Sequence, residues 1–235
     1  MTKSKQPYPT ELNDTQWSKI RPYLPAEART GRPREHGWRM ILNGIFYLLQ
    51  SGCSWRMLPH DLPPWKTVYH YFRLWRMNGT WERLNKLIRE KVRLKFGKKR
   101  QSSATILDSQ SIKTSEGGLE CGFDAGKQVT GRKRHSLVDT LGLVVKVIVT
   151  AGNVQDRDGA KLLLKELAQQ ADTIKRLKLI WVDGSYRGTL IDWVAEHFGW
   201  KLEVVEKLKD QVGFQVLPKR WIVERTFAWL VRQRR

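Results

Sequence analysis

Three carboxylates stand at positions where an ionised side chain needs a partner. Asp108 and Asp183 each end a short apolar run that should form a buried strand. Glu224 falls on a helical stripe that also carries Trp221 and Phe227, one turn to either side. An ionised carboxylate is costly to bury unless it is paired or bound to a metal. The three positions therefore predict a shared cation site.

Inward-facing acids from two strands and a helix suit a particular reaction. We expect Asp108, Asp183 and Glu224 to bind two Mg²⁺ ions about 4 Å apart, an arrangement suited to in-line attack at phosphorus. In such a site the ions activate a water or hydroxyl nucleophile and stabilise the leaving oxygen. The predicted chemistry is metal-dependent cleavage of a phosphodiester.

Each acid also has a simpler structural interpretation. Asp108 and Asp183 could form strand-ending turns with the small residues that follow them. Glu224 could pair with Arg220 or Arg225. For any one acid taken alone, the structural interpretation explains its position at least as well as a catalytic role does. The catalytic interpretation therefore depends on finding all three acids, each on the expected strand or helix. Other acids are expected to cap a helix (Asp156 or Asp158) or to be solvated (Glu203, Glu206 and Asp210).

The elements that must position these acids fill residues 101–235. Short apolar runs alternate there with helical stretches, in the order three strands, helix, strand, helix, strand, helix. This order predicts an α/β fold with an RNase H-like, mixed five-stranded sheet. The expected strands are 104–108 with a possible extension to 112, 132–139, 143–150, 178–182 and 202–205. Helices are expected from Asp156 or Asp158, over 189–197, and from Pro218 to the chain end.

Residues 1–100 show helical periodicity instead and predict a separate all-α domain, with a boundary near Lys98–Ser103. Helices are expected over 36–50, 65–76 and 80–95. A proline-containing turn before a helix rich in aromatic and basic residues is typical of a helix-turn-helix, in which 65–76 would read DNA. A plain bundle with an aromatic core and a solvated charged face fits the same pattern equally well.

The charge of the chain favours a polyanionic partner. Its 235 residues include 43 Lys and Arg against 23 Asp and Glu, a formal net charge of +20. Residues 1–100 hold 21 basic and 7 acidic side chains, so the helical part is the more basic. Neutralising phosphates releases counterions, which makes double-stranded DNA a natural partner. Ribosomal or membrane-surface proteins can be equally basic. The residues predicted to contact DNA are Arg32, Arg34, Lys66, His70, Arg73, Arg132, Lys133, Arg134 and Arg220.

The remaining composition points to a cytoplasmic protein. Cys53 and Cys121 form no disulfide framework, which fits a reducing compartment. The N-terminus lacks the apolar core of a signal peptide. No apolar run approaches the roughly 20 residues that span a bilayer. We therefore expect no membrane partner.

Five segments resemble the signature blocks of bacterial insertion-sequence transposases with a DDE catalytic domain. These segments are ILDSQS, GRKRHSLVDTLGLV, NVQDRDGA, WVDGSY and RWIVERTFAWL. The GRPRE and SGCSWRMLP segments are similar to the helical domain that precedes it in such proteins. The resemblance covers nearly the whole chain. It implies an RNase H-like catalytic domain with Asp108, Asp183 and Glu224 as the metal-binding acids and Mn²⁺ able to replace Mg²⁺. It also implies binding to terminal inverted repeats, cleavage and strand transfer into target DNA by transesterification, and a homodimer in the DNA complex.

Two features depart from the family pattern. Relatives in the wider superfamily carry Tyr, Arg, Glu and Lys at fixed spacing around the third acid. Arg220 and Glu224 match this pattern, whereas Leu217 and Val231 replace the Tyr and Lys. The chain also ends at Arg235, where relatives continue, so we expect a C-terminal truncation and weak or absent catalysis. Two alternatives remain: an inactive DNA-binding remnant or repressor of the element, and a metal-dependent nuclease that cuts without joining.

Overall fold

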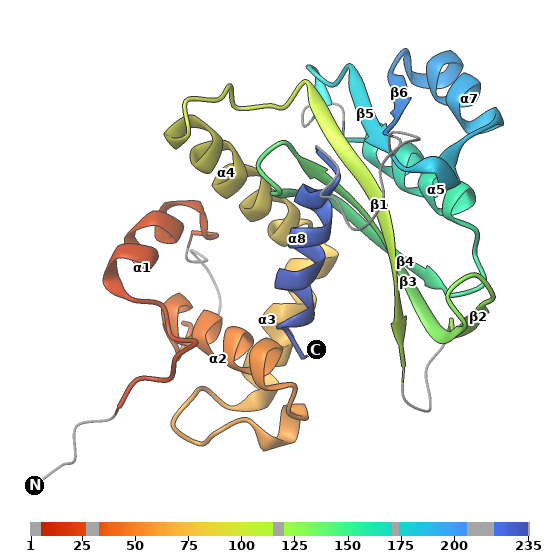
Figure 1. The fold of residues 1–235 in the computed structure, drawn as a ribbon. Helices are drawn as coiled ribbons and strands as arrows, with labels where there is room; N and C mark the ends of the chain where they lie inside the picture. The colour runs from red at the N-terminus through yellow and green to blue at the C-terminus, as the bar shows by residue number, and fades with distance from the viewer. Residues whose placement is uncertain (1–5, 27–32, 115–119, 171–173, 206–218, 235) are drawn as a thin grey trace, which may run out of the picture. The chain divides into compact units, whose positions relative to one another are not determined.

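A computed structural model of the chain describes residues 6–26, 33–114, 120–170, 174–205 and 219–234. The chain divides into two compact units (Figure 1). One unit comprises Met1–Ile88 together with Trp229–Arg235, and the other comprises Arg89–Ala228. Within the described ranges, no helix is both long and apolar enough to cross a membrane.

The first unit is helical, as the periodicity predicts. Asn13 begins the first helix with a capping box, because its side chain accepts from Gln16 N while Gln16 bonds back to its backbone. Gly52 ends the second helix at φ 71°, a left-handed conformation that glycine adopts without strain. The α-helices are α1 (Asp14–Ile20), α2 (Trp38–Ser51), α3 (Trp65–Met77) and α4 (Thr80–Lys95), whose last residues belong to the second unit.

Packing of α2 against α3 forms the main core of this unit. Ile41, Ile45 and Leu48 of α2 are fully buried and share a cluster with Val68 of α3. Leu42 of α2 is buried as well, whereas Met40 is 36% exposed.

The second unit is a mixed α/β fold, and its described residues form six strands rather than the five predicted. The strands are β1 (Ala104–Lys113), β2 (Gly122–Asp124), β3 (Val129–Asp139), β4 (Val144–Ala151), β5 (Leu179–Val182) and β6 (Lys201–Val204). Their order is β2-β3-β1-β5-β6, with β4 also paired to β3. Strand β3 is antiparallel to β1, β2 and β4, whereas β1, β5 and β6 are parallel. This is the RNase H-like arrangement that the order of elements predicts, with the three-residue β2 as an unpredicted addition.

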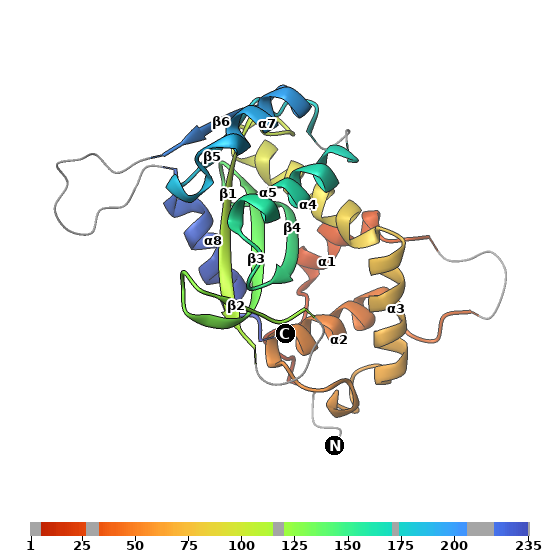
Figure 2. The same cartoon turned by 90° about the vertical axis from the view of Figure 1, so that its right-hand side faces the viewer.

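Helices lie on both faces of the sheet (Figures 1 and 2). Helices α5 (Asp156–Ala168) and α7 (Thr189–Phe198) cover one face, and α8 (Trp221–Val231) lies on the other. The core under α5 joins Leu163, Leu164 and Leu167 to Leu107 and Leu137 of the sheet. The predicted cap of α5 is wrong: Gln155 is the N-cap residue and makes no side-chain cap bond. The predicted helix start at Pro218 lies outside the described residues.

The two compact units divide inside α4, between Ile88 and Arg89, whereas the predicted boundary near Lys98–Ser103 stays a prediction. Contacts of Arg89 and Arg93 within the second unit explain why the end of α4 belongs to that unit. Arg93 forms a 2.6 Å ion pair with Asp139, and their side chains are 5% and 0% exposed. Arg89 donates to the carbonyl of Val144 at 2.8 Å. These bonds attach the end of α4 to the hairpin of β3 and β4.

One glycine of α5 should be essential for packing. A Cβ added to Gly159 would overlap the imidazole ring of His135, which is fully buried. We expect Gly159→Ala to lower the free energy of unfolding by about 1–3 kcal/mol, the usual cost of overpacking. Urea unfolding measures this change, with Gly37→Ala as the control because a Cβ there meets nothing within 4 Å. His135→Ala in the Gly159→Ala background should recover part of the loss. Equal effects of the two glycine substitutions would contradict the packing argument.

Candidate active site

Asp108 and Asp183 lie side by side because β1 and β5 run parallel. Ile106 of β1 pairs with Trp181 of β5. Each aspartate is two residues further along its strand, so the two reach equivalent positions on the same face. Neighbouring strands are about 4.8 Å apart. The backbone register therefore sets the spacing of these two carboxylates.

The local backbone orients each aspartate in the same way. Asp108 Oδ1 accepts a 2.7 Å hydrogen bond from Ser109 N. Asp183 Oδ1 accepts from Ser185 N at 2.9 Å and from Ser185 Oγ at 2.5 Å. In both residues the other oxygen, Oδ2, faces Arg220, with distances to its Nη2 of 3.9 Å from Asp108 and 3.7 Å from Asp183.

Glu224 completes the group from α8. Its Oε1 lies 3.4 Å from the same Nη2 atom of Arg220. Three carboxylates thus surround one guanidinium nitrogen, and any two of the three oxygens are at most 7.6 Å apart. The structure brings together all three acids that the sequence predicts for the site.

Glu224 is nevertheless not buried on an apolar stripe of α8, contrary to what the sequence predicts. The buried residues of α8 are Val223, Thr226 and Phe227. Trp221 is 40% exposed, and the side chain of Glu224 is 54% exposed. The glutamate therefore lies at the edge of the buried face of α8 and not within an apolar stripe.

The turn between β3 and β4 fixes the position of α8 on the sheet. Thr226 Oγ1 donates to the carbonyl of Gly142 at 2.8 Å, and Arg225 Nη2 donates to the carbonyl of Leu141 at 2.9 Å. Gly142 has φ 80°, and a Cβ there would lie 2.9 Å from the Arg225 guanidinium. Asp139 organises this turn by accepting from Leu141 N and Leu143 N. The hairpin turn thereby holds α8, which carries Glu224 and begins directly after Arg220.

Burial and the neighbouring charges act most strongly on Asp108. Burial raises the pKa of Asp108 to about 6, and neighbouring Asp183 adds to the rise, while the Ser109 hydrogen bond and the charges of Arg220 and Lys127 oppose it. Among the described residues, no group of His, Cys, Asp and Glu stands in a ready-made ligating arrangement. Arg220 supplies the positive charge between the acids. Carboxylate oxygens are nonetheless the donors that Mg²⁺ and Mn²⁺ prefer, so the donor set fits such ions.

The basic segment of β3 divides between the two faces of the sheet. Gln110 pairs with Arg134 and Ile112 with Arg132, so both arginines share the face of Asp108. They are half-buried and lie in the row that leads away from the acids. Their contact with DNA stays a prediction.

Lys133 does not match its predicted DNA contact. Its side chain is 6% exposed and points to the opposite face, where it pairs with Asp124 and Asp156 at 3.1 Å each. Burial alone would lower the pKa of Lys133, but the two carboxylates raise it. Lys133 is therefore a structural cation, because the pleat of β3 turns every second residue toward α5.

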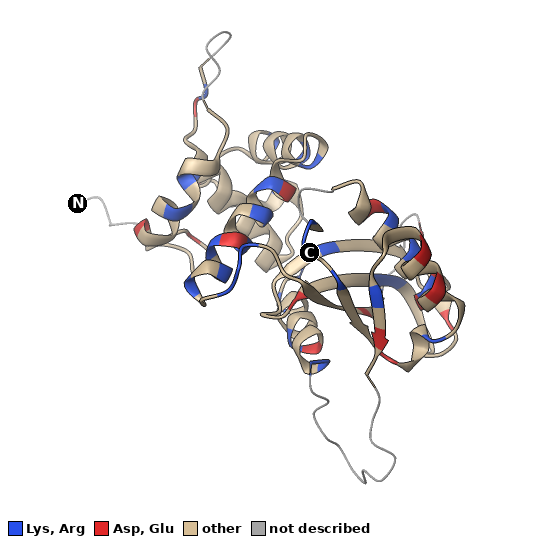
Figure 3. Cartoon of the chain, turned by 90° about the horizontal axis from the view of Figure 1, so that it is seen from above, with Lys and Arg blue, Asp and Glu red and all other residues tan. Residues whose placement is uncertain are grey.

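The predicted DNA contacts of the helical unit fall in two groups. Lys66, His70 and Arg73 are all exposed on α3, in a unit whose helices carry many Lys and Arg positions (Figure 3). Arg34 instead lies 3.7 Å above the ring of Trp38 and donates to the carbonyl of His36, so it is engaged within the unit. Arg32 lies outside the described residues.

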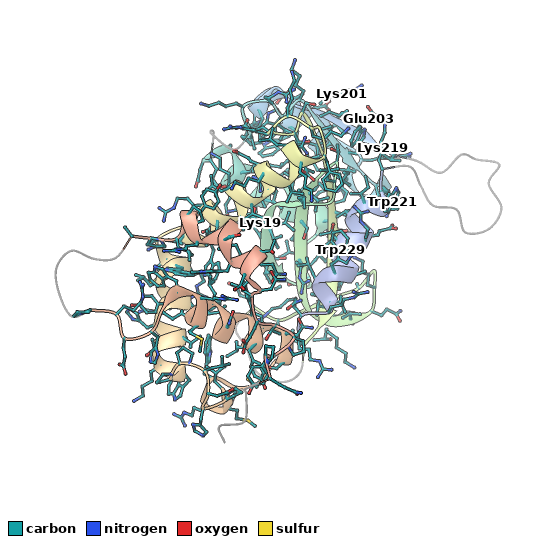
Figure 4. All side chains as sticks on the ribbon, turned by 90° about the vertical axis from the view of Figure 1, so that its left-hand side faces the viewer. Lys19, Lys201, Glu203, Lys219, Trp221 and Trp229 are labelled. Atoms are coloured by element: carbon teal, nitrogen blue, oxygen red, sulfur yellow. The ribbon has the colours of Figure 1, made fainter. Side chains whose placement is uncertain are left out.

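Of the three acids that the sequence predicts to be solvated, one lies among the described residues. Glu203 on β6 is 3.6 Å from Lys201 and partly exposed, and Glu206 and Asp210 lie outside the described residues. The residues that flank Arg220 are both exposed at the start of α8 (Figure 4). Of these, Lys219 holds its ammonium 4.3 Å from the ring centre of Trp181, and Trp221 stacks with Arg225.

Sequence reasoning missed two residues beside the acids. Ser185 donates two hydrogen bonds to Asp183 Oδ1 and so orients that carboxylate. In the sequence, the position of Ser185 within the WVDGSY segment is the one feature that indicates this role. Lys127 approaches Asp108 from the turn that follows β2, with its Nζ 3.3 Å from the carbonyl of Ser109. No sequence pattern indicates that approach, because it depends on the three-residue strand β2.

The raised pKa of Asp108 predicts a stability change that depends on pH. Above about pH 6 the folded protein holds an ionised Asp108 at a cost, because the unfolded chain ionises it more readily, near 3.8. Without divalent cations, Asp108→Asn should therefore raise the free energy of unfolding at pH 8 by up to about 3 kcal/mol. The gain should shrink as the pH falls below 6 and vanish below about 4. A gain that is equal at pH 8 and pH 3.5 would contradict the assignment.

Solved structures of transposases show a distant likeness to this chain. The piggyBac transposase in a synaptic complex with hairpin DNA is 13% identical, with a TM-score of 0.33. The match covers 58% of this chain and 28% of that one. The Mos1 transposase in a paired-end complex with the left transposon end is 13% identical, with a TM-score of 0.29, over 76% of this chain and 61% of that one. Likeness at this level carries no assignment.

Sequence relatives are more informative. The uncharacterized 16.2 kDa protein of insertion element IS402 from Burkholderia cepacia is 31% identical over 118 residues, which is 47% of this chain and 78% of that protein. The uncharacterized protein y4sN from Sinorhizobium fredii is 32% identical over 64 residues, or 27% of this chain and 51% of that protein.

Family profiles match both parts of the chain. Residues 12–85 match a family described as putative transposases of the IS4/5 family. Residues 99–235, more than half of the chain, match the transposase DDE domain, and this segment contains Asp108, Asp183 and Glu224. Together with the relative from an insertion element, these matches show that the chain belongs to the DDE-domain transposases of insertion sequences.

Proposed function

We propose that this protein is a DNA transposase that binds the terminal inverted repeats of an insertion sequence and catalyses metal-dependent strand cleavage and strand transfer. One observation carries the proposal: three carboxylates from two strands and a helix surround a single positive charge, in a chain of the DDE transposase family. Double-stranded DNA, both the repeats and the target, is the proposed partner. A homodimer would hold two element ends in one complex.

Asp108, Asp183 and Glu224 are the proposed metal ligands. Two Mg²⁺ ions, or Mn²⁺ in their place, would supply activation of the water or hydroxyl nucleophile and stabilisation of the leaving oxygen. The hydrogen bonds to the Oδ1 atoms of the two aspartates leave both Oδ2 atoms directed at a common point. The exposed Glu224 can adjust its side chain around that point.

Arg220 would change partners when the site is loaded. Its guanidinium now neutralises the three acids, and divalent ions would take over that role. A planar guanidinium binds phosphate as readily as carboxylate. We therefore assign Arg220 to a DNA phosphate near the cleaved bond in the loaded complex.

DNA recognition is assigned mainly to the helical unit. Lys66, His70 and Arg73 are exposed on α3, which would enter a groove as the reading helix of a helix-turn-helix. This division leaves the second unit to cut and join. Arg132 and Arg134 would contact the DNA backbone near the acids, because they share the face of Asp108.

The first test separates catalysis from binding. Asp108→Asn, Asp183→Asn and Glu224→Gln should each abolish Mg²⁺-dependent cleavage and strand transfer on DNA that carries the element ends. Each variant should still bind that DNA, because the groups assigned to recognition remain. Glu166→Gln is the matched control, since this acid belongs to α5, on the face of the sheet opposite to α8, and pairs with Lys146.

The same assay distinguishes the alternatives. Cleavage without joining would identify a nuclease, and binding without either step would identify an inactive DNA-binding protein. Full activity of all three site variants would refute the assignment of the acids.

A second test addresses the arginines of β3. Replacing Arg132 and Arg134 together by Gln should weaken DNA binding and flatten its dependence on salt. The logarithmic slope should fall by about 0.9 for each phosphate that the protein no longer neutralises. Binding titrations at several salt concentrations measure the slope. An unchanged slope would show that these side chains neutralise no phosphate.

A further inference from the structure

The turn between β2 and β3 is built around a buried carboxylate. Asp124 Oδ1 accepts from Gly126 N at 3.1 Å and from Lys127 N at 3.2 Å. Its Oδ2 accepts from Ser111 Oγ at 2.5 Å and lies 3.1 Å from Lys133 Nζ. Burial alone would raise the pKa of Asp124, but these hydrogen bonds and the charge of Lys133 outweigh it and lower the pKa to about 2. The turn is thus tied to β1 and β3 by an ionised side chain.

This turn places Lys127 next to the acids. Its Nζ donates to the carbonyl of Ser109 at 3.3 Å, and Ser109 directly follows Asp108. The positive charge of Lys127 lowers the pKa of Asp108, which is consistent with that proximity. The side chain is otherwise exposed to solvent.

The acceptor of this hydrogen bond is itself held in place. Ser109 Oγ donates to Asp156 Oδ1 at 2.7 Å, and Asp156 also pairs with Lys133. Lys133 therefore connects the two supports of Lys127, because it bonds both to Asp124 in the turn and to Asp156 beside Ser109. A buried network thus holds both the backbone of Lys127 and the carbonyl of Ser109, which accepts the hydrogen bond from the Lys127 ammonium.

A purely structural role explains this placement poorly. The turn is already closed by Asp124, so it does not need the Lys127 side chain. Holding a lysine side chain in one geometry costs up to about 2 kcal/mol of conformational entropy, and one exposed hydrogen bond returns about 1 kcal/mol. In the part of the chain that the structure describes, Lys127 makes no ion pair, and its ammonium keeps two further donors.

We propose that Lys127 is a phosphate-contacting residue of the catalytic site, which neutralises a phosphate of the DNA strand that enters beside Asp108. The inference rests on the proposed function, because it takes DNA as the ligand. Lys127 would approach that strand from the β2–β3 turn, whereas Arg220 approaches from α8. The two cations would thus bracket the DNA at the acids from two different elements.

The test compares Lys127→Met, Lys127→Arg and a control lysine. Lys178→Met is the matched control, because Lys178 is exposed at the amino end of β5, at the opposite end of that strand from Asp183. The probe is a labelled duplex copied from the DNA that flanks the coding sequence, titrated over roughly 50–200 mM salt. Lys127→Met should bind about 5–10-fold more weakly near 0.1 M salt and lower the logarithmic salt slope by about 0.9. Lys127→Arg should restore the slope.

The outcomes separate this inference from the function on which it rests. A slope for Lys127→Met equal to that of the unchanged protein, or a loss no larger than that of Lys178→Met, would overturn the role of Lys127. A lowered slope that Lys127→Arg fails to restore would also overturn it, because a phosphate contact needs only the charge. Asp108→Asn, assayed in parallel, reports on the proposed function alone through its loss of cleavage. Absence of DNA binding by the unchanged protein would overturn both.

Discussion

Three carboxylates within a few ångströms repel one another, and the second unit is organised around the positive charge that offsets this repulsion. In the folded chain that charge is the guanidinium of Arg220, whose Nη2 lies within 3.9 Å of an oxygen from each acid. A neutral side chain there would leave the repulsion between the acids uncompensated, and Asp183 already raises the pKa of Asp108. The site is consequently held together by a cation that belongs to the protein, which keeps the acids close before any other cation arrives.

The supports of the site lie on opposite faces of the sheet and act on different acids. Under α5, the chain from Lys133 through Asp156 to Ser109 holds the backbone next to Asp108. On the other face, Gly142 and its neighbours hold α8 and so place Glu224. A defect in one support should therefore disturb one part of the site and leave the other in position. Strands β1 and β5 position Asp108 and Asp183, whereas Glu224 belongs to α8, which the turn between β3 and β4 holds against the sheet.

Much of this arrangement could be predicted from the sequence, and the failures have physical causes. The apolar runs before Asp108 and Asp183 correctly predict strands, because buried parallel strands need continuous apolar residues. The argument from burial fails for Glu224, since the face of a helix depends on tertiary packing and α8 buries Val223, Thr226 and Phe227 instead. The prediction that Lys133 contacts DNA fails because adjacent basic residues look alike in sequence, whereas the pleat separates them. Lys127 depends on a three-residue strand that has no periodicity to detect.

The pairing of β1 with β5 has a kinetic consequence. Ala104 and Leu179, which begin this pairing, are far apart in the sequence, and such non-local parallel contacts form slowly because the intervening chain must first be ordered. Until β5 docks beside β1, the two aspartates belong to separate segments and no shared site exists. The proposed cleavage activity would therefore require that β5 has docked beside β1.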